Sequence, residues 1–91
     1  MAFHLSGTIT VPAADLARVR AALPEHMRLT LAEPGCRAFS VVEKADGVFA
    51  VDETFADEAS FAAHQARIPG TAWAEASAGA VRDYRTWVDQ G

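Results

Sequence analysis

The chain has 91 residues, 51% of them apolar, and 20 of its residues are alanine. This length predicts one domain over residues 1–91, without room for a separate cofactor-binding module. Eight basic and twelve acidic residues give a net charge of -4, and the arginines are scattered, so a nucleic acid partner is excluded. No apolar run approaches the ~20 residues of a membrane span. The sequence therefore predicts a cytoplasmic protein that does not bind membranes.

The first third of the chain predicts a strand followed by a long helix. Residues 3–11 alternate between apolar and polar side chains, which is the period of a half-buried strand. From Pro12 the period becomes helical, with an apolar stripe at Leu16, Val19, Leu23, Met27 and Leu31. Pro24 lacks an amide proton and predicts a kink or two abutting helices. Glu33-Pro34-Gly35 predicts a stop and a turn, with Gly35 suited to a positive φ.

The remaining two thirds predict a hairpin, a second helix and a last strand. Two β-rich runs, 37–44 and 48–55, flank Asp46-Gly47, a pair typical of tight antiparallel turns. Asp57 is suited to cap a helix over 57–68, and Pro69-Gly70 ends it. A short piece around 71–77, helical or irregular, leads to a strand over 81–88. The order β-α-β-β-α-β predicts an α+β, ferredoxin-like fold with a four-stranded antiparallel sheet.

The predicted sheet has helices on one face only. Its odd-numbered face carries large apolar residues, while the other face carries smaller or polar ones, such as Ser6, Thr8, Ser40, Ala50 and Tyr84. Neither face looks fully solvated, and an alanine-rich core is thin. These observations predict a homodimer that forms through the sheet.

Two stretches carry a resemblance to a known family: HMRLTLAEPGCRAFSV at 26–41 and VFAVDETFADEASFAAHQAR at 48–67. They combine an EPGC turn, a V-x-E-x-F strand with Glu53 and Phe55, and an F-x-x-H-Q helix with His64. This combination is similar to the signature of the antibiotic biosynthesis monooxygenase (ABM) family, over about residues 3 to 88. The resemblance implies a dimeric α+β barrel with a pocket between the sheet and the helices of each subunit.

The resemblance also implies an activity. Family members insert oxygen into quinol- or anthrone-like aromatics with molecular oxygen and no metal, flavin or other cofactor, and other branches degrade haem or isomerise small metabolites. Haem-degrading members use a histidine after the second helix and a first-strand asparagine, whereas this chain has no histidine beyond His64 and has Ser6 or a neighbour at the asparagine position. Haem degradation is therefore disfavoured. The asparagine–tryptophan pair of anthrone oxygenases is also missing, which puts anthrone in doubt.

His26, His64 and Glu53 are the candidate catalytic residues. Cofactor-free oxygenation requires a base that deprotonates the substrate, and neutral imidazole suits that role. Glu53 could orient an imidazole or hold it protonated beside a phenolate. The structural alternative is that all three are packed core residues with satisfied polar atoms. No HxH or HxxxH spacing is present, so no metal site is predicted.

The candidate substrate-binding residues are Trp73, Phe39, Phe55, Ser6 and Arg67. The three aromatic residues could line a slot for a flat ligand, although for the two phenylalanines a core position is favoured. Arg67 could hold an anionic group and is otherwise a surface residue. The sequence thus predicts a cofactor-independent monooxygenase that acts on a quinol or a similar electron-rich aromatic. Alternatives are an isomerase or lyase acting on a small oxygenated metabolite, and a non-catalytic protein that binds a small ligand.

Overall fold

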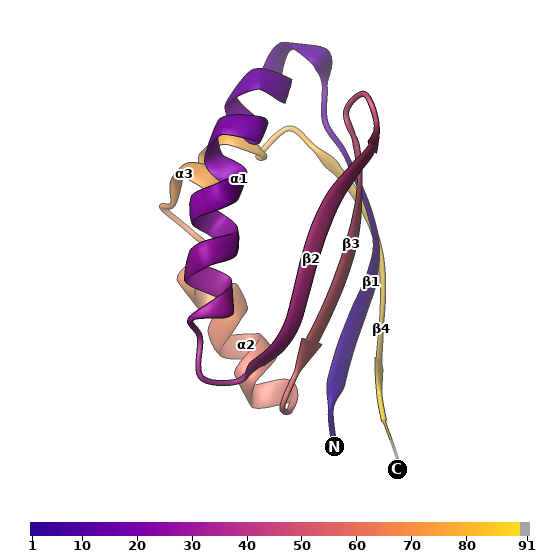
Figure 1. The fold of residues 1–91 in the computed structure, drawn as a ribbon, viewed down its shortest axis with the longest axis vertical. Coiled ribbons are helices and arrows are strands. Elements are labelled where there is room, and N and C mark those ends of the chain that lie inside the picture. Colours follow the sequence, from indigo (N-terminus) through magenta and orange to yellow (C-terminus); the bar gives the residue numbers. More distant parts are fainter. Residues whose placement is uncertain (90–91) are drawn as a thin grey trace.

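A computed structural model describes residues 1–89, and the last two positions of the predicted range 1–91 lie outside the described part. Its elements are β1 (Phe3–Thr10), a 3-10 turn (Ala13–Asp15), α1 (Leu16–Leu31), β2 (Cys36–Ala45), β3 (Val48–Phe55), α2 (Glu58–Arg67), α3 (Ala72–Ala76) and β4 (Val81–Val88) (Figure 1). The predicted α+β, ferredoxin-like order is confirmed, with α3 as a short addition before β4. Among the described residues, no helix is long and apolar enough to span a membrane.

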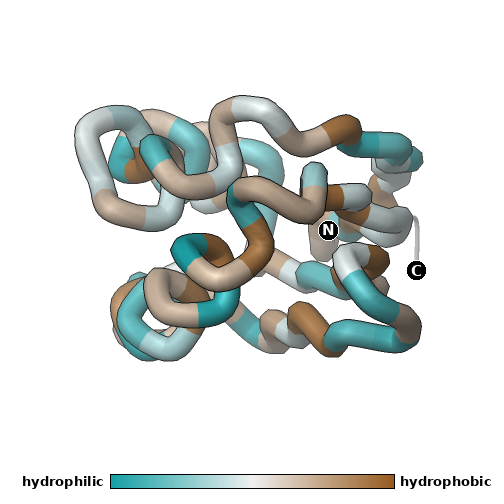
Figure 2. The backbone as a smooth tube through the Cα atoms, turned by 90° about the horizontal axis from the view of Figure 1, so that it is seen from above, coloured by the Kyte–Doolittle hydropathy of each residue, from teal (hydrophilic) through white to brown (hydrophobic). Residues whose placement is uncertain are grey.

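The four strands form one antiparallel sheet in the order β2-β3-β1-β4. The β2–β3 hairpin turns at Asp46-Gly47, as predicted, and Gly47 adopts a φ of 77°. All helices cover one face, so that the chain forms a helical layer and a sheet layer (Figure 2). The core between the layers contains the odd-numbered strand residues Phe3, Leu5, Ile9, Phe39, Val41, Phe49, Val51 and Phe55.

Tyr84 was predicted on the even-numbered face of the sheet together with Ser6 and Thr8. In the structure it lies on the face that the helices cover. The register pairs Tyr84 with Gly7 of β1, whose odd-numbered neighbours Leu5 and Ile9 face the helices. Tyr84 accordingly packs against the hydrophobic core and is half-buried. The prediction was wrong because the alternation of faces restarts in each strand, and only pairing fixes its phase.

Of the two alternatives predicted at Pro24, the division into two abutting helices is wrong, because α1 is continuous through this residue. Proline removes the hydrogen bond to the carbonyl of Arg20, but both residues lie on the exposed side of the helix, where water can satisfy that carbonyl. The predicted stripe is correct for the fully buried Val19 and wrong for Leu31, which is 55% exposed. Instead, the two polar residues His26 and Thr30 are buried on the same face as Val19. The face of α1 that contacts the sheet is therefore partly polar.

Gly35 is required for close packing rather than for a positive φ. Within residues 1–89, only Gly47 and Gly70 have a positive φ. A Cβ atom on Gly35 would overlap the Cβ and Oγ atoms of Ser60 on α2. The EPGC turn therefore lets the end of α1 approach α2, and that approach brings the polar side chains described below together.

Replacing Gly35 with alanine is expected to destabilise the protein by about 1–3 kcal/mol, because the added methyl group overpacks this contact. The Ser60→Gly background removes the overlapping atoms and leaves the Cα of Ser60 at 3.5 Å, an ordinary contact distance. Urea unfolding of the natural protein, the two single variants and the double variant gives the change in free energy of unfolding caused by Gly35→Ala with and without the Ser60 side chain. An equal cost in both would show that Ser60 is not the cause.

Candidate functional site

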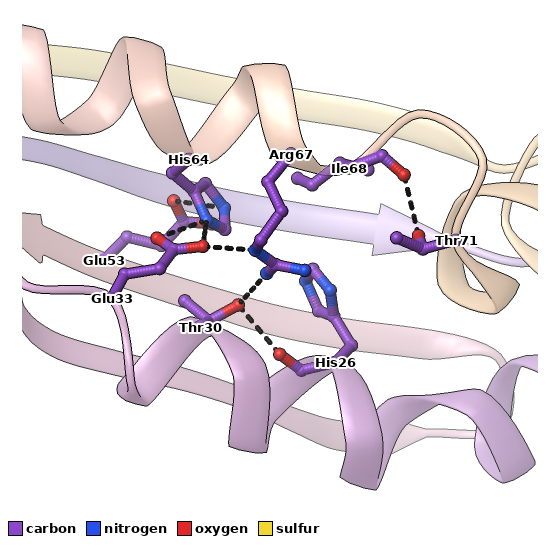
Figure 3. A network of polar contacts seen from close by, with 8 residues as sticks. All are labelled: His26, Thr30, Glu33, Glu53, His64, Arg67, Ile68 and Thr71. Carbon is purple, nitrogen blue, oxygen red and sulfur yellow. Dashed lines mark hydrogen bonds and ion pairs between the residues drawn. The ribbon is translucent and has the colours of Figure 1, made fainter.

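Three segments bring polar side chains together at one end of the helical layer. Helix α2, capped by the Asp57 carboxylate at 2.8 Å from the Ser60 amide, carries His64 and Arg67 one turn apart. Glu33 follows the end of α1, in the EPGC turn. Glu53 projects from β3 toward the same place (Figure 3). These residues are far apart in the sequence, and the packing of α1 and α2 on the sheet brings them close together.

His64 lies between the two glutamates. Its Nδ1 atom is 3.0 and 3.1 Å from the two carboxylate oxygens of Glu33. Its Nε2 atom is 4.0 Å from Oε1 of Glu53, too far for a hydrogen bond. The side chain is 2% exposed. This imidazole is therefore fixed on one side and free on the other.

Arg67 ties Glu33 to α1. Its Nε–H donates to Glu33 Oε2 at 2.6 Å, and Nη2 donates to the Thr30 hydroxyl at 3.0 Å. Thr30 in turn donates to the carbonyl of His26 at 2.8 Å. The sequence prediction for Arg67 left two possibilities open, contact with an anionic group or an ordinary surface position. In the structure its guanidinium is already paired with the carboxylate of Glu33.

Glu53 is buried without a partner for one of its oxygens. The residue is 8% exposed, and Oε1 has no hydrogen-bond partner. Burial, with a smaller contribution from the nearby Glu33 carboxylate, raises the pKa of Glu53 to about 7. Near neutral pH this carboxyl can therefore donate as well as accept a hydrogen bond.

His26 faces the same cluster from α1. Its ring stacks on Trp73 with centroids 4.7 Å apart, and the His64 ring lies at 6.0 Å. Burial, helped by the neighbouring His64 and Arg67, lowers the pKa of His26 to about 4. Its Nδ1 atom is buried without a hydrogen-bond partner. His26 is consequently neutral at pH 7 and a weak base.

Aromatic side chains enclose the two histidines. Phe39 contacts both imidazoles, with centroids 5.5 Å from His26 and 5.8 Å from His64. Phe55 lies 5.0 Å from the His64 ring. Together with Trp73 they form the hydrophobic surroundings of the polar cluster, and all three are buried.

Ser6 is separated from this group. Its hydroxyl donates to Asp52 at 2.8 Å, on the sheet face that the helices leave open. The structure thus brings together His26, His64, Glu53, Trp73, Phe39, Phe55 and Arg67, and leaves Ser6 apart. Even-numbered residues of β1 point away from the helices, which is the physical reason for the separation.

A cleft of about 360 Å³ reaches the cluster from outside. It opens between the EPGC turn and α2, and Glu33, His64 and Arg67 line it together with small residues such as Gly35 and Ala63. The sequence predicted a pocket beneath the helices, between helix and sheet. This cleft instead approaches His64 from the side of Glu33.

Sequence reasoning missed the structural importance of Glu33 and Thr30. In the sequence, Glu33 indicates only a turn, and no local pattern marks Thr30 as a buried residue. The available signal was that Glu33 belongs to the EPGC motif itself, next to the glycine that permits close packing. Among residues 1–89, no group of three or more His, Cys, Asp or Glu side chains is arranged to hold a metal ion.

The family model named antibiotic biosynthesis monooxygenase matches residues 2–87. The fold is that of a small α+β protein, and because the family model covers nearly all of the chain, the chain belongs to the antibiotic biosynthesis monooxygenase family. No curated protein sequence matches the chain significantly.

Solved structures show the same fold. SnoaB, a cofactor-independent oxygenase from Streptomyces nogalater, is 13% identical with a TM-score of 0.78, and the alignment covers 99% of this chain and 94% of that chain. A candidate antibiotic biosynthesis monooxygenase from Nitrosomonas europaea is 18% identical with a TM-score of 0.80 and 100% coverage of both chains. A Mycobacterium tuberculosis protein, Rv0793, is 14% identical with a TM-score of 0.80, over 100% of this chain and 97% of that chain. At these identities the similarity establishes the fold alone.

Proposed function

We propose that this protein is a cofactor-independent monooxygenase that acts on a quinol or a related electron-rich aromatic. The observation that carries the proposal is the buried His64, whose Nε2 atom faces the unpaired Oε1 of Glu53 at 4.0 Å within an aromatic enclosure. A substrate hydroxyl bonded to both groups would bridge this gap. The membership of the ABM family and the oxygenase activity named for SnoaB support the same activity.

The reaction begins with proton removal. His64 takes the hydroxyl proton of the quinol, because His26 is too weak a base at neutral pH. The resulting anion is rich enough in electrons to react with molecular oxygen. For the simplest quinol, benzene-1,4-diol, one oxygen atom enters the ring and the other leaves as water, giving 2-hydroxy-1,4-benzoquinone. All four electrons come from the substrate, so that no cofactor is consumed.

The neighbouring residues stabilise the charge that forms. Glu53, whose pKa of about 7 keeps a large share protonated at neutral pH, can donate a hydrogen bond to the developing oxyanion. A substrate would enter through the cleft lined by Glu33, His64 and Arg67, and Trp73, Phe39 and Phe55 form the buried apolar surroundings of the imidazoles. Their burial also limits the access of water to the reactive anion.

Oxygen uptake by purified, chelator-treated protein tests the proposal with a panel of quinols. The expected result is consumption of one molecule of oxygen for each molecule of hydroxyquinone formed, at a rate well above the uncatalysed background. Turnover that is independent of oxygen would indicate an isomerase or lyase instead. Ligand-shifted melting without any turnover would indicate a binding protein. Either outcome would contradict the monooxygenase proposal.

We also propose that the protein is a homodimer that forms through the open face of the sheet. Three large apolar residues on that face are exposed: Val42 at 46%, Val81 at 69% and Trp87 at 42%. Burying them against a second copy would remove apolar surface from water.

Light scattering after size-exclusion chromatography is expected to give the mass of two chains at micromolar concentration. Val42→Glu places a charge on the open face and is expected to shift the protein toward the monomer. Leu31→Glu is the matched control, because Leu31 is 55% exposed on α1 and away from the sheet. A monomeric natural protein, or equal effects of the two substitutions, would contradict this interface.

A further inference from the structure

We propose that Glu33, held by Arg67, is the positioning residue of His64: it fixes the proton on Nδ1 and thereby keeps Nε2 as the proton acceptor. The inference rests on the proposed function, because positioning matters to a reaction only if His64 is its base. It assigns a role to a residue that interacts with the base rather than with the substrate.

The hydrogen bonds decide which nitrogen of His64 carries the proton. A carboxylate only accepts hydrogen bonds, and both of its oxygens lie within 3.1 Å of Nδ1. The neutral imidazole therefore carries its proton on Nδ1 and leaves a lone pair on Nε2. The other charged or titratable groups that face this ring are Glu53 on β3, His26 on α1 and Arg67 on its own helix.

Glu33 is itself held in place, which a positioning role requires. Arg67 donates to its Oε2 at 2.6 Å and is anchored to Thr30 at 3.0 Å. Thr30 is completely buried on α1, so this chain of hydrogen bonds links α2 to the core. The carboxylate is also only 15% exposed, which limits competition from water. The arrangement therefore orients the imidazole as well as selecting its tautomer.

The consequence lies on the opposite edge of the ring. With the proton on Nδ1, the Nε2 lone pair faces Glu53 at 4.0 Å, where a substrate hydroxyl would be placed. The other tautomer would present an N–H group there and could not accept a proton. When His64 becomes protonated during the reaction, the Glu33 carboxylate stabilises the imidazolium without leaving its place.

The Glu33→Gln variant tests this role directly. An amide has only one acceptor oxygen, for which Arg67 and His64 must compete, and its NH₂ group then meets the other partner. Nitrogen-15 NMR of the resting protein should show His64 mainly as the Nδ1–H tautomer, and the variant should lose that preference. Glu25→Gln is the matched control, because Glu25 pairs with Arg28 on the exposed side of α1. An unchanged tautomer in Glu33→Gln would overturn the inference.

Kinetics provide the second readout. With the quinol substrate, Glu33→Gln should lower kcat on the order of 100-fold with little change in KM, since misorientation affects the base and not the binding surfaces. The Glu25→Gln control should retain the natural kcat. A rise in KM with an unchanged kcat would contradict the positioning role. If the natural protein shows no turnover at all, the proposed function fails, and the NMR result alone then decides whether Glu33 sets the tautomer.

Discussion

Replacing His64 with asparagine is expected to lower kcat/KM for a quinol by about 10²- to 10⁴-fold, the range that a general base contributes. The physical reason is that the other histidine of the site cannot take over, because burial lowers the pKa of His26 to about 4. The measurement is oxygen uptake under the conditions in which the natural protein turns over. The loss should appear mainly in kcat, since the aromatic enclosure is unchanged.

His26→Ala is the informative comparison for this prediction. It removes the ring that stacks on Trp73, at a centroid distance of 4.7 Å, and leaves the proposed base intact. We expect a rate loss that is at least tenfold smaller than that of His64→Asn, on the order of what lost packing causes. Equal rates for the two variants would falsify the assignment of the base to His64.

Glu53→Gln is expected to become progressively more stable than the natural protein as the pH rises from about 4.5 to 7. The pKa of Glu53 is about 7 in the folded protein, against a normal value of 4.5. Between these values the folded state binds more protons than the unfolded state, so the free energy of unfolding of the natural protein falls with pH. Glutamine does not titrate and escapes this loss, which amounts to about 3 kcal/mol when complete.

His26 changes the free energy of unfolding with pH in the opposite direction, over nearly the same pH range. Its pKa is about 4 in the folded protein, against a normal value of 6.5, so that here the unfolded state binds more protons. This contribution increases the free energy of unfolding from pH 4 to 6.5. In the natural protein the two contributions therefore largely cancel between pH 4.5 and 6.5, and the contribution of Glu53 remains up to about pH 7.

Urea unfolding at a series of pH values separates the two groups. The free energy of unfolding of Glu53→Gln minus that of the natural protein should rise with pH. The same difference for His26→Gln should fall, and each change should be about 3 kcal/mol. Groups that titrate in every variant do not contribute to these differences. Differences that stay flat across pH 4 to 7 would show that neither side chain is desolvated in the folded protein.

Much of the fold could be predicted from the sequence because its signals are local. The alternation in residues 3–11, the Asp46-Gly47 turn and the Asp57 cap each act within a few residues, and each element is present. The errors concern features that depend on the surroundings of a residue in the folded protein. The helix is not divided in two at Pro24, which lies on the exposed side of α1, and the face of Tyr84 depends on its register with Gly7.

For the candidate site, residue type indicated the chemistry but not the geometry. The side chains of His26, His64 and Glu53 can move protons, which makes them candidates from the sequence, and the structure brings them into one cluster. Their different environments could not be read from the sequence. Neither could the pairing of Glu33 with His64, which joins residues 31 positions apart.

The sequence by itself determined the order of strands and helices, the family and the set of side chains able to move protons. Only the tertiary structure decided that His64 lies between two glutamates, that His26 is a weak base beside Trp73, and that Ser6 lies on the other face of the sheet. Periodicity and turn residues express short-range preferences of the backbone. A hydrogen bond or a pKa shift depends on which distant segments exclude water from a side chain, and that is set when the helices pack on the sheet.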